Sequence, residues 1–332
     1  MPIAARAPKL EDVAREAGVS TATVSRFLNS PDVVAEATAK RIRVAIEATG
    51  YIPNALAGDL ASNRTRMIAV LIPHLENSLF AEMIESMVSD LSVNGNNVML
   101  GLTGASVDRT DNLVRAALAR RVDAIVSTGP IGEDLAKLVR RSGALFIEVW
   151  ELPEDPVGIA IGFSHADAGR DLARFLASRG YRYPHLVTAD TPRAQRRRAG
   201  FVREWAAIGN DAPSEASVDL PTRFGHARRI FAEMRHLDQR PDVVVCGSDH
   251  LAQGMIVEAQ AAGLRVPDDL GVVGFGNNTV AGEMRPTITS IDIDGSRIAR
   301  EVMGAITCHQ EGREFDTRSI DVGFRLIARE SV

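Results

Sequence analysis

Two patterns of apolar and polar positions follow one another along the chain. Over roughly the first 50 residues, apolar side chains recur at the spacing of amphipathic helices. From Met67 onward, short apolar runs alternate with longer amphipathic segments. The first pattern predicts a small all-helical module. The second predicts parallel β-sheets whose strands are joined by right-handed crossover helices.

The N-terminal pattern predicts three short helices. Gly18 breaks the first helix at a position that favours positive φ, and Ser20 or Thr21 can cap the second. The third runs from about Ala35 to Thr49, with a weak cap at its start and Gly50 as its stop. The apolar positions expected on the buried faces are Leu10, Val13, Ala14, Ala17, Val24, Phe27, Leu28, Ile42, Ala45 and Ile46.

The remaining pattern contains two series of strands and helices. The expected strands are 68–72, 98–102, 124–127 and 145–149, and then 186–188, 243–246 and 271–275. The expected helices are 79–94, 108–120 and 132–142, and then 165–179, 195–208, 224–236 and 249–262. Two such series predict two doubly wound lobes, with a ligand bound between them at the carboxyl ends of the strands.

These patterns divide the chain into three parts. Residues 1–53 form the helical domain, and residues 54–66 form a short, marginal helix with a linker. Residues 67–332 form the two-lobed domain. Its lobes are expected at about 67–162 and 163–290, with the C-terminal segment crossing back between them.

Composition and charge narrow the class of protein. The 332 residues are 45% hydrophobic and 24% charged, and no apolar run is long enough to span a membrane. The first residues lack the apolar segment of a secretory signal, so we expect a cytoplasmic, nucleoid-associated bacterial protein. Two cysteines exclude a disulfide scaffold.

The net charge is unevenly distributed along the chain. It is −5 overall, which argues at first against a nucleic-acid partner. Residues 1–66, however, hold 9 Lys and Arg against 7 Asp and Glu, a net of +2, whereas the rest of the chain holds 29 against 36, a net of −7. The sign of this difference indicates an N-terminal module with its own partner.

Residues 10–29, LEDVAREAGVSTATVSRFLN, have the pattern of a helix-turn-helix. Ser20, Ser25 and Asn29 can donate to phosphates, and Thr21, Ala22 and Arg26 can reach base edges. Thr23 completes the set of candidate DNA contacts. The alternative is a helix pair that packs on the larger domain.

The same stretch closely resembles the lactose-repressor (LacI/GalR) family of bacterial transcription regulators. The resemblance includes YIPN (51–54), Ala57 and Leu60, continues through VPDDLGVVGF (266–275) and covers nearly the whole chain. RFLNSPDVVAE, GYIPN, LENSLFAEM and VGIAIGF are most similar to the gluconate-repressor branch. The implied fold is a helix-turn-helix domain followed by a periplasmic-binding-protein-like sensor.

The resemblance also implies roles for residues of the short linker helix. Leu60 matches a leucine that wedges into the minor groove at the centre of the operator, and Ala57 lines the same face. Asn54 and Tyr51 match contacts to the DNA backbone. Asp59 departs from the family, because an acid beside phosphates is unfavourable. The alternative for Leu60 is an ordinary apolar linker residue.

Seven residues are expected at the effector site, of which Leu79, Phe80, Arg197 and Asp249 are implied by the resemblance. The seven are Leu79, Phe80, Trp150, Arg193, Arg197, Asp249 and Asn277. Arg197 matches a ligand-gripping arginine, and Asp249 matches a position that orients sugar hydroxyls or caps the helix behind it. Leu79, Phe80 and Trp150 have a plain alternative as buried packing residues.

The segment after Phe275 reads Gly276-Asn277-Asn278, where many sugar- and purine-binding relatives carry Asp. Without that acid, a site that holds arginines favours an anionic effector, and a sugar acid fits better than a neutral sugar.

Other chemistry finds little support in the sequence. His165 and His250 lack partners at metal-ligand spacing, so no metal, no cofactor and no catalytic set is expected.

We therefore expect a homodimeric repressor of a carbohydrate or sugar-acid catabolic operon. An effector such as gluconate or a ketogluconate would release it from a palindromic operator. A sugar-binding transport receptor and an α/β sugar-processing enzyme are the alternatives.

Overall fold

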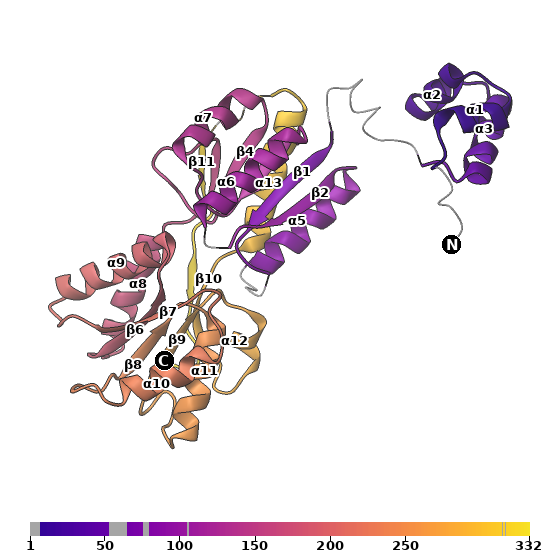
Figure 1. The fold of residues 1–332 in the computed structure, drawn as a ribbon. Helices are drawn as coiled ribbons and strands as arrows, with labels where there is room; N and C mark the ends of the chain where they lie inside the picture. Colours follow the sequence, from indigo (N-terminus) through magenta and orange to yellow (C-terminus); the bar gives the residue numbers. More distant parts are fainter. Residues whose placement is uncertain (1–6, 53–64, 76–79, 105, 314, 316) are drawn as a thin grey trace. The chain divides into compact units, whose positions relative to one another are not determined.

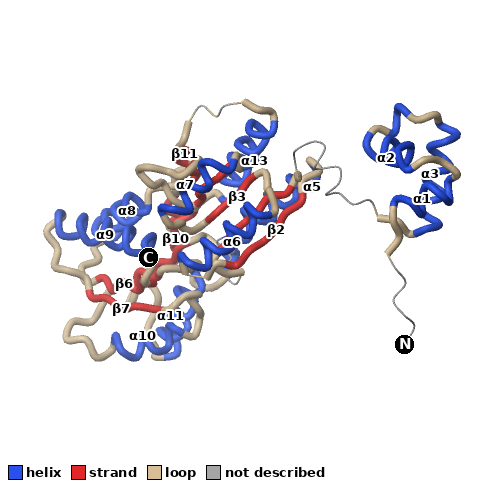
Figure 2. Tube along the Cα trace, turned by 45° about the horizontal axis from the view of Figure 1, so that its top comes forward, coloured by secondary structure: helices blue, strands red, loops and turns tan. Residues whose placement is uncertain are grey.

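The computed structural model describes residues 7–52, 65–75, 80–104, 106–313, 315 and 317–332. The chain divides into two compact units, Met1–Thr65 and Arg66–Val332. Figures 1 and 2 show that the first is all-helical and the second combines helices with strands.

The N-terminal unit contains α1 (Leu10–Ala17), α2 (Thr21–Asn29), a 3₁₀ turn and α3 (Glu36–Thr49). Gly18 ends α1 with φ of 62°, as its position predicts. Ser20 caps α2, because its Oγ accepts a hydrogen bond from the Thr23 N–H at 3.2 Å. Val13, Val24 and Ile42 are fully buried at the centre. These contacts confirm the three helices and the faces they bury.

The first lobe is built on a six-stranded parallel sheet with the order β11-β5-β4-β3-β1-β2. Its N-terminal elements are β1 (Met67–Ile72), α5 (Ala81–Val93), β2 (Asn97–Leu102), α6 (Val107–Ala119), β3 (Ala124–Ser127), α7 (Glu133–Ser142), β4 (Leu145–Val149) and β5 (Ile159–Gly162). Helices cover both faces, which explains the unbroken apolar run of the central strand β1.

The second lobe repeats this topology with the order β12-β10-β9-β8-β6-β7. Its elements are α8 (His165–Ser178), β6 (Pro184–Ala189), α9 (Pro192–Ala207), β7 (Ser214–Val218), α10 (His226–Met234), β8 (Val243–Cys246), α11 (Asp249–Ala261), β9 (Gly271–Phe275), α12 (Thr279–Glu283) and β10 (Thr289–Asp292). The sheet departs from the parallel expectation at one strand, because β12 pairs antiparallel with β10.

The chain crosses between the lobes three times. The first crossing joins β5 to α8, and the second leads from β10 to α13 (Gly295–Gln310), which packs on α5 of the first lobe. β11 (Ser319–Asp321) then completes the first sheet, and β12 (Arg325–Ile327) returns to the second. The C-terminal segment thus contributes to both lobes.

Some element boundaries differ from those that the sequence predicts. α9 begins at Pro192 rather than at residue 195, because Thr191 caps it and proline suits the first helical position. The pattern also missed β5, β7, β10 and α13. No helix within the described ranges is long and apolar enough to cross a membrane.

Candidate functional site

The outer face of α2 carries small and polar side chains. Thr21, Ala22 and Arg26 are exposed, and Thr23 and Ser25 are partly exposed. Val24 and Phe27 lie on the opposite, buried face. The exposed face of α2 therefore carries small, hydrogen-bonding side chains of the kind that can enter a major groove.

The other predicted DNA contacts are placed less completely. The Asn29 side chain, Asn54, Ala57 and Leu60 lie outside the described residues. Tyr51 is half-buried and packs on the core of the helical unit. Ser20 lies at the start of α2, where its hydroxyl oxygen already serves as the helix cap.

The sensor unit contains a cavity of about 230 Å³ between its two lobes. Its walls come from the carboxyl ends of strands, as the doubly wound topology predicts. Pro73 and His74 follow β1, Thr103 follows β2, and Trp150 follows β4. Ala189 ends β6 in the second lobe, and the start of α9 completes that wall.

Two arginines of α9 reach this cavity. Arg193 and Arg197 lie four residues apart and therefore project from the same face of the helix. Burial lowers the pKa of both to about 10, and the charge of Arg193 contributes to the shift at Arg197. Both guanidinium groups are therefore positively charged at neutral pH.

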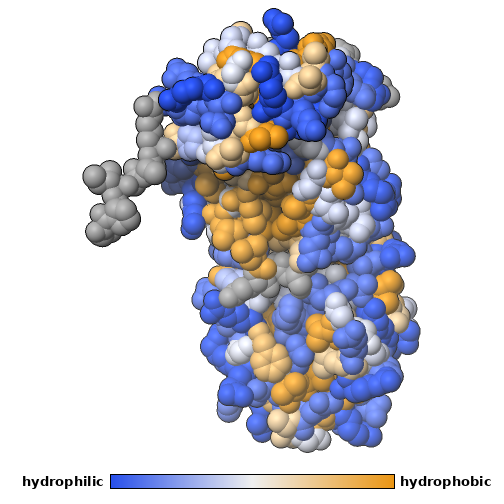
Figure 3. Space-filling view, turned by 90° about the vertical axis from the view of Figure 1, so that its right-hand side faces the viewer, coloured by the Kyte–Doolittle hydropathy of each residue, from blue (hydrophilic) through white to orange (hydrophobic). Residues whose placement is uncertain are grey.

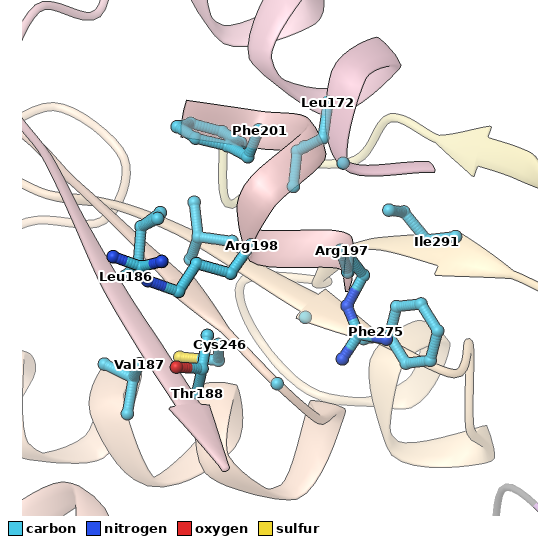
Figure 4. Close-up of a pocket in the computed structure, with 14 residues that line it drawn as sticks. Leu172, Leu186, Val187, Thr188, Arg197, Arg198, Phe201, Cys246, Phe275 and Ile291 are labelled. Carbon is cyan, nitrogen blue, oxygen red and sulfur yellow. The ribbon is translucent and has the colours of Figure 1, made fainter. Parts of the chain in front are cut away.

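Arg197 is held by neutral groups. Its Nη1 lies 3.2 Å from Nδ1 of His165, and its guanidinium carbon lies 3.8 Å from the centre of the Phe275 ring. Figure 4 shows Arg197 beside Phe275, with Arg198 directed away from it. Among the described residues, Arg197 forms no ion pair with a carboxylate. The second lobe therefore presents a partly buried cation that no carboxylate of the described residues neutralises.

His165 is locked in one neutral form. Its Nε2 lies 3.0 Å from the carbonyl oxygen of Trp150 and must carry the proton, because a carbonyl can only accept. Nδ1 is then free to accept the hydrogen bond from Arg197. Burial and the charges of Arg197 and Arg193 lower the pKa of His165 to about 2. His165 thus orients Arg197 without changing the charge of the cavity.

Arg193 has protein partners that Arg197 lacks. Its Nε lies 3.7 Å from Oε2 of Glu151, and its Nη2 donates to the carbonyl of Val149 at 3.5 Å. Both partners belong to the first lobe, so this arginine links the lobes. The two arginines predicted for the site therefore lie together but in different electrostatic environments.

The apolar wall comes from the first lobe. Phe80 and Trp150 line the cavity and meet edge to face, with ring centroids 5.3 Å apart. Trp150 is only 1% exposed, and its indole N–H donates to the sulfur of Met83 at 3.2 Å. The Trp150 ring therefore forms part of the wall and is fixed there by neighbours in the core. Leu79 lies outside the described residues.

Polar groups complete the cavity. The hydroxyl-bearing residues that line it are Thr103, Ser106, Thr110, Thr128, Thr191 and Thr222. The Nε2 atom of His74 is buried and has no hydrogen-bond partner among the described residues. A ligand with hydroxyl groups could satisfy this nitrogen.

Asp249 and Asn277 are not among the residues that line the cavity. Asp249 is fully buried and accepts hydrogen bonds from the Ser290 hydroxyl at 2.6 Å and the Asn278 N–H at 2.7 Å. The suggested helix cap at Asp249 is wrong, because Ser248 caps α11. Asn277 donates to Asp292 and accepts from Arg329. Both side chains bind other elements of the second lobe.

A second, smaller cavity of about 30 Å³ is also lined by Arg197 and Phe275 (Figure 4). Leu172, Phe201 and Ile291 give it a mainly apolar lining. This volume admits about two water molecules and is too small for a sugar. The larger cavity is therefore the candidate effector site.

Sequence reasoning missed three functional groups of this cavity. His165 and Glu151 matter through contacts with α9, and His74 matters through its unpartnered nitrogen. Each follows the carboxyl end of a strand or precedes a helix there, and that position is the signal that could have singled them out. The described residues contain no cluster of side chains able to hold a metal ion.

A helix-turn-helix unit joined to a two-lobed sensor with a cavity at its strand ends defines a ligand-responsive DNA-binding regulator. Comparison with known proteins bears on this class. Residues 9–54 match the family described as bacterial regulatory proteins, lacI family, and residues 173–332 match the periplasmic binding protein-like domain.

Individual relatives match over nearly the full chain. The HTH-type transcriptional regulator GntR of Pseudomonas aeruginosa is 31% identical over 327 residues, covering 98% of this chain and 95% of the relative. A LacI-family transcriptional regulator from Silicibacter pomeroyi is 25% identical with a TM-score of 0.91, covering 98% and 99%. The lac repressor dimer bound to operator and the anti-inducer ONPF shares the fold, with 23% identity, a TM-score of 0.82 and coverage of 98% and 99%.

The chain belongs to the LacI family of bacterial regulatory proteins. It is a DNA-binding transcriptional regulator, and its relatives are regulators rather than enzymes. The class predicted from residues 10–29 is thereby confirmed.

Proposed function

We propose that the protein represses a sugar-acid catabolic operon and is released from its operator by a monoanionic sugar acid such as gluconate or a ketogluconate. The observation that carries this proposal is Arg197, a partly buried guanidinium that neutral groups hold and that no carboxylate of the described residues neutralises.

An anion beside Arg197 should gain more binding free energy than a neutral ligand. A buried charge without a counter-ion is costly, so a ligand that supplies the missing negative charge gains more there than at a solvated surface. Guanidinium geometry suits a carboxylate, which can accept two parallel N–H donors. The N-terminus of α9 lies at the same wall and adds a further electrostatic preference for negative charge.

The rest of the ligand is inferred from the opposite wall. Threonine hydroxyls and the buried Nε2 of His74 can pair with hydroxyl groups, and Phe80 offers an apolar surface to C–H groups. At about 230 Å³, the cavity is below the roughly 300–1,000 Å³ of pockets for drug-sized ligands. A small polyhydroxy acid combines the required charge, hydroxyls and size.

On the DNA side, we propose that α2 reads the major groove, with Arg26 reaching base edges. We also propose that Leu60 from each of two protomers enters the minor groove at the centre of the site. A twofold protein requires a pseudo-palindromic operator. Effector binding would close the lobes and unfold the linker helices, provided that it binds the closed state more tightly.

An apolar face of the first lobe supports a homodimer. Leu100 and Leu102 on β2 are 42% and 37% exposed, and Ile84 and Val88 on α5 are partly exposed. Figure 3 shows apolar side chains gathered on the face that contains α5 and β2. Exposed apolar patches of this kind mark association surfaces.

The proposed dimer interface can be tested by introducing a charged residue into it. Leu100→Lys should shift the protein from dimer to monomer in sedimentation, because it places a charge in the proposed interface. The control is Val257→Lys, which changes an apolar residue of similar exposure, 41%, on α11 of the second lobe. If neither substitution dissociates the dimer, the proposed interface is contradicted.

The proposed effector class is tested with open-chain ligands that differ at one carbon. Gluconate carries a carboxylate, whereas glucitol carries a hydroxymethyl group in its place. Gluconate should raise the melting temperature and release the protein from DNA upstream of its own gene, and glucitol should do neither at the same concentration. Equal responses to both ligands would contradict an anion site, and lack of salt-sensitive DNA binding would contradict the proposed operator.

A further inference from the structure

One carboxylate already lies among the cations of the cavity. Glu151 follows β4 in the first lobe, and its side chain is 18% exposed. Its Oε2 lies 3.7 Å from Nε of Arg193, and its Oε1 lies against Nη1 of Arg196. Glu151 therefore extends from one lobe to the arginines of α9 on the other.

The charged side chains that line the cavity can be placed individually. Among the described residues they are Glu151, Asp190, Arg193 and Arg197. Asp190 is exposed, so water screens its charge. Of the other three, Glu151 forms an ion pair with Arg193 while its second oxygen contacts the exposed Arg196, and Arg197 forms no ion pair with a carboxylate among the described residues. Among the described residues that line the less exposed part of the cavity, Glu151, Arg193 and Arg197 sum to one positive charge, and Arg197 is the cation without a carboxylate partner.

We propose that Glu151 determines specificity for the number of charges on the ligand. By neutralising Arg193, it leaves a single cation for the effector and so selects a monocarboxylate over a dicarboxylate of the same carbon skeleton. This inference rests on the proposed function, because it assumes that an anionic ligand occupies this cavity.

The physical basis is competition for Arg193. A second carboxylate on the ligand could reach that guanidinium only by displacing Glu151 or by lying beside it, and like charges at close range repel. Glu151→Gln keeps the size of the side chain and removes its charge. Arg193 then becomes a second cation without a carboxylate partner, and a ligand with two carboxylates can bind to both arginines.

The experiment compares gluconate and glucarate, which share six carbons and carry one and two carboxylates. Calorimetric titration of the wild-type protein should show gluconate binding at least about 10-fold more tightly. In Glu151→Gln, the affinity for glucarate relative to gluconate should rise by at least about 10-fold. The double variant Glu151→Gln/Arg193→Gln should lose that gain, because its second cation is gone.

Asp190→Asn is the matched control, since it removes an acid from the rim of the same cavity. It should change the glucarate-to-gluconate ratio by less than about threefold, because water screens an exposed charge. If both single variants shift the ratio equally, the effect is one of overall charge and the role of Glu151 is overturned.

An unchanged ratio in Glu151→Gln would also overturn the inference, even if both acids bind. That result would leave the proposed function intact, because gluconate would still bind more tightly than glucitol. Binding of neither acid to the wild-type protein would contradict the proposed function, and this inference would fail with it.

Discussion

The helical unit and the sensor unit both meet anions under the proposed function, but they are built for this in opposite ways. The helical unit presents an exposed face on α2, and residues 1–66 carry a net charge of only +2. The sensor carries a net charge of −7 over residues 67–332, and yet it holds the partly buried Arg193 and Arg197 beside one cavity. The sign of the net charge of a unit therefore does not reveal where its anion site is.

The two sites differ mainly in how far their charges are shielded from water. At an exposed surface, ions and water weaken each charge, so binding needs many contacts across a large interface. In a cavity, one guanidinium without a counter-ion can discriminate a charged ligand from a neutral one.

The largest expected difference between the two units is in the salt dependence of their binding affinities. If the dimer neutralises about six phosphates, raising salt from 50 to 200 mM should weaken operator binding by about 10³-fold. Gluconate binding should change by less than about threefold over the same range, because a buried pair is screened little. Parallel titrations measure both, and equally steep salt dependence would remove the distinction between the sites.

Arg197→Gln should nearly abolish the response to effector. The variant should stay on operator DNA at gluconate concentrations about 100-fold above those that release the wild-type protein, because it lacks the unneutralised cation. Gel-shift titration measures this. Arg203→Gln, an exposed position on the same helix, should respond normally. A normal response from Arg197→Gln would exclude this residue from the site.

Arg26→Ala should weaken specific operator binding by about 1–3 kcal/mol and leave the response to effector unchanged. Arg26 lies on the exposed face of α2, so the substitution should remove a contact without disturbing the core. The matched control is Arg15→Ala on α1, whose guanidinium contacts Asp12 instead. Unchanged operator affinity in Arg26→Ala would count against α2 as the reading helix.

His165 should make a smaller, pH-dependent contribution to the free energy of unfolding. Its pKa is about 2 in the folded protein and about 6.5 when unfolded, so only the unfolded chain gains a proton between these values. Stability should therefore fall as pH decreases from 6.5 to 5, by up to about 1.4 kcal/mol per pH unit from this residue.

Denaturant unfolding of His165→Asn tests that slope. The variant should lose this part of the pH dependence, because asparagine does not titrate. His236→Asn, at an exposed position, should retain it. Identical pH profiles for the wild-type protein and His165→Asn would show that His165 does not remain neutral in the fold.

Much of the fold could be predicted from local sequence patterns. The elements that these patterns missed were missed for physical reasons. β1 and β9 are continuous apolar runs because both faces of their sheets are covered. β7 was missed because it is a partly exposed edge strand with the sequence SEASV. α13 was missed although it is long, and it contains Gly295 and Gly304, residues that weaken a helical pattern.

The candidate site was predictable only in part. The family resemblance singled out Arg197, Arg193 was expected to add a second positive charge, and the structure brings both to the cavity. The sequence could not reveal that the two arginines have different electrostatic surroundings, because Glu151 and His165 approach α9 from distant parts of the chain. Asp249 and Asn277 lie instead in hydrogen-bond networks within the second lobe.

The most direct test of the account is a thermodynamic cycle between the ligand carboxylate and Arg197. Gluconate and glucitol would be titrated calorimetrically into the wild-type protein and into Arg197→Gln. We predict that the wild-type protein binds gluconate at least about 100-fold more tightly, and that the variant loses this preference while its affinity for glucitol is unchanged. A preference for gluconate that survives in Arg197→Gln would contradict the claim that this buried, unneutralised arginine recognises the effector.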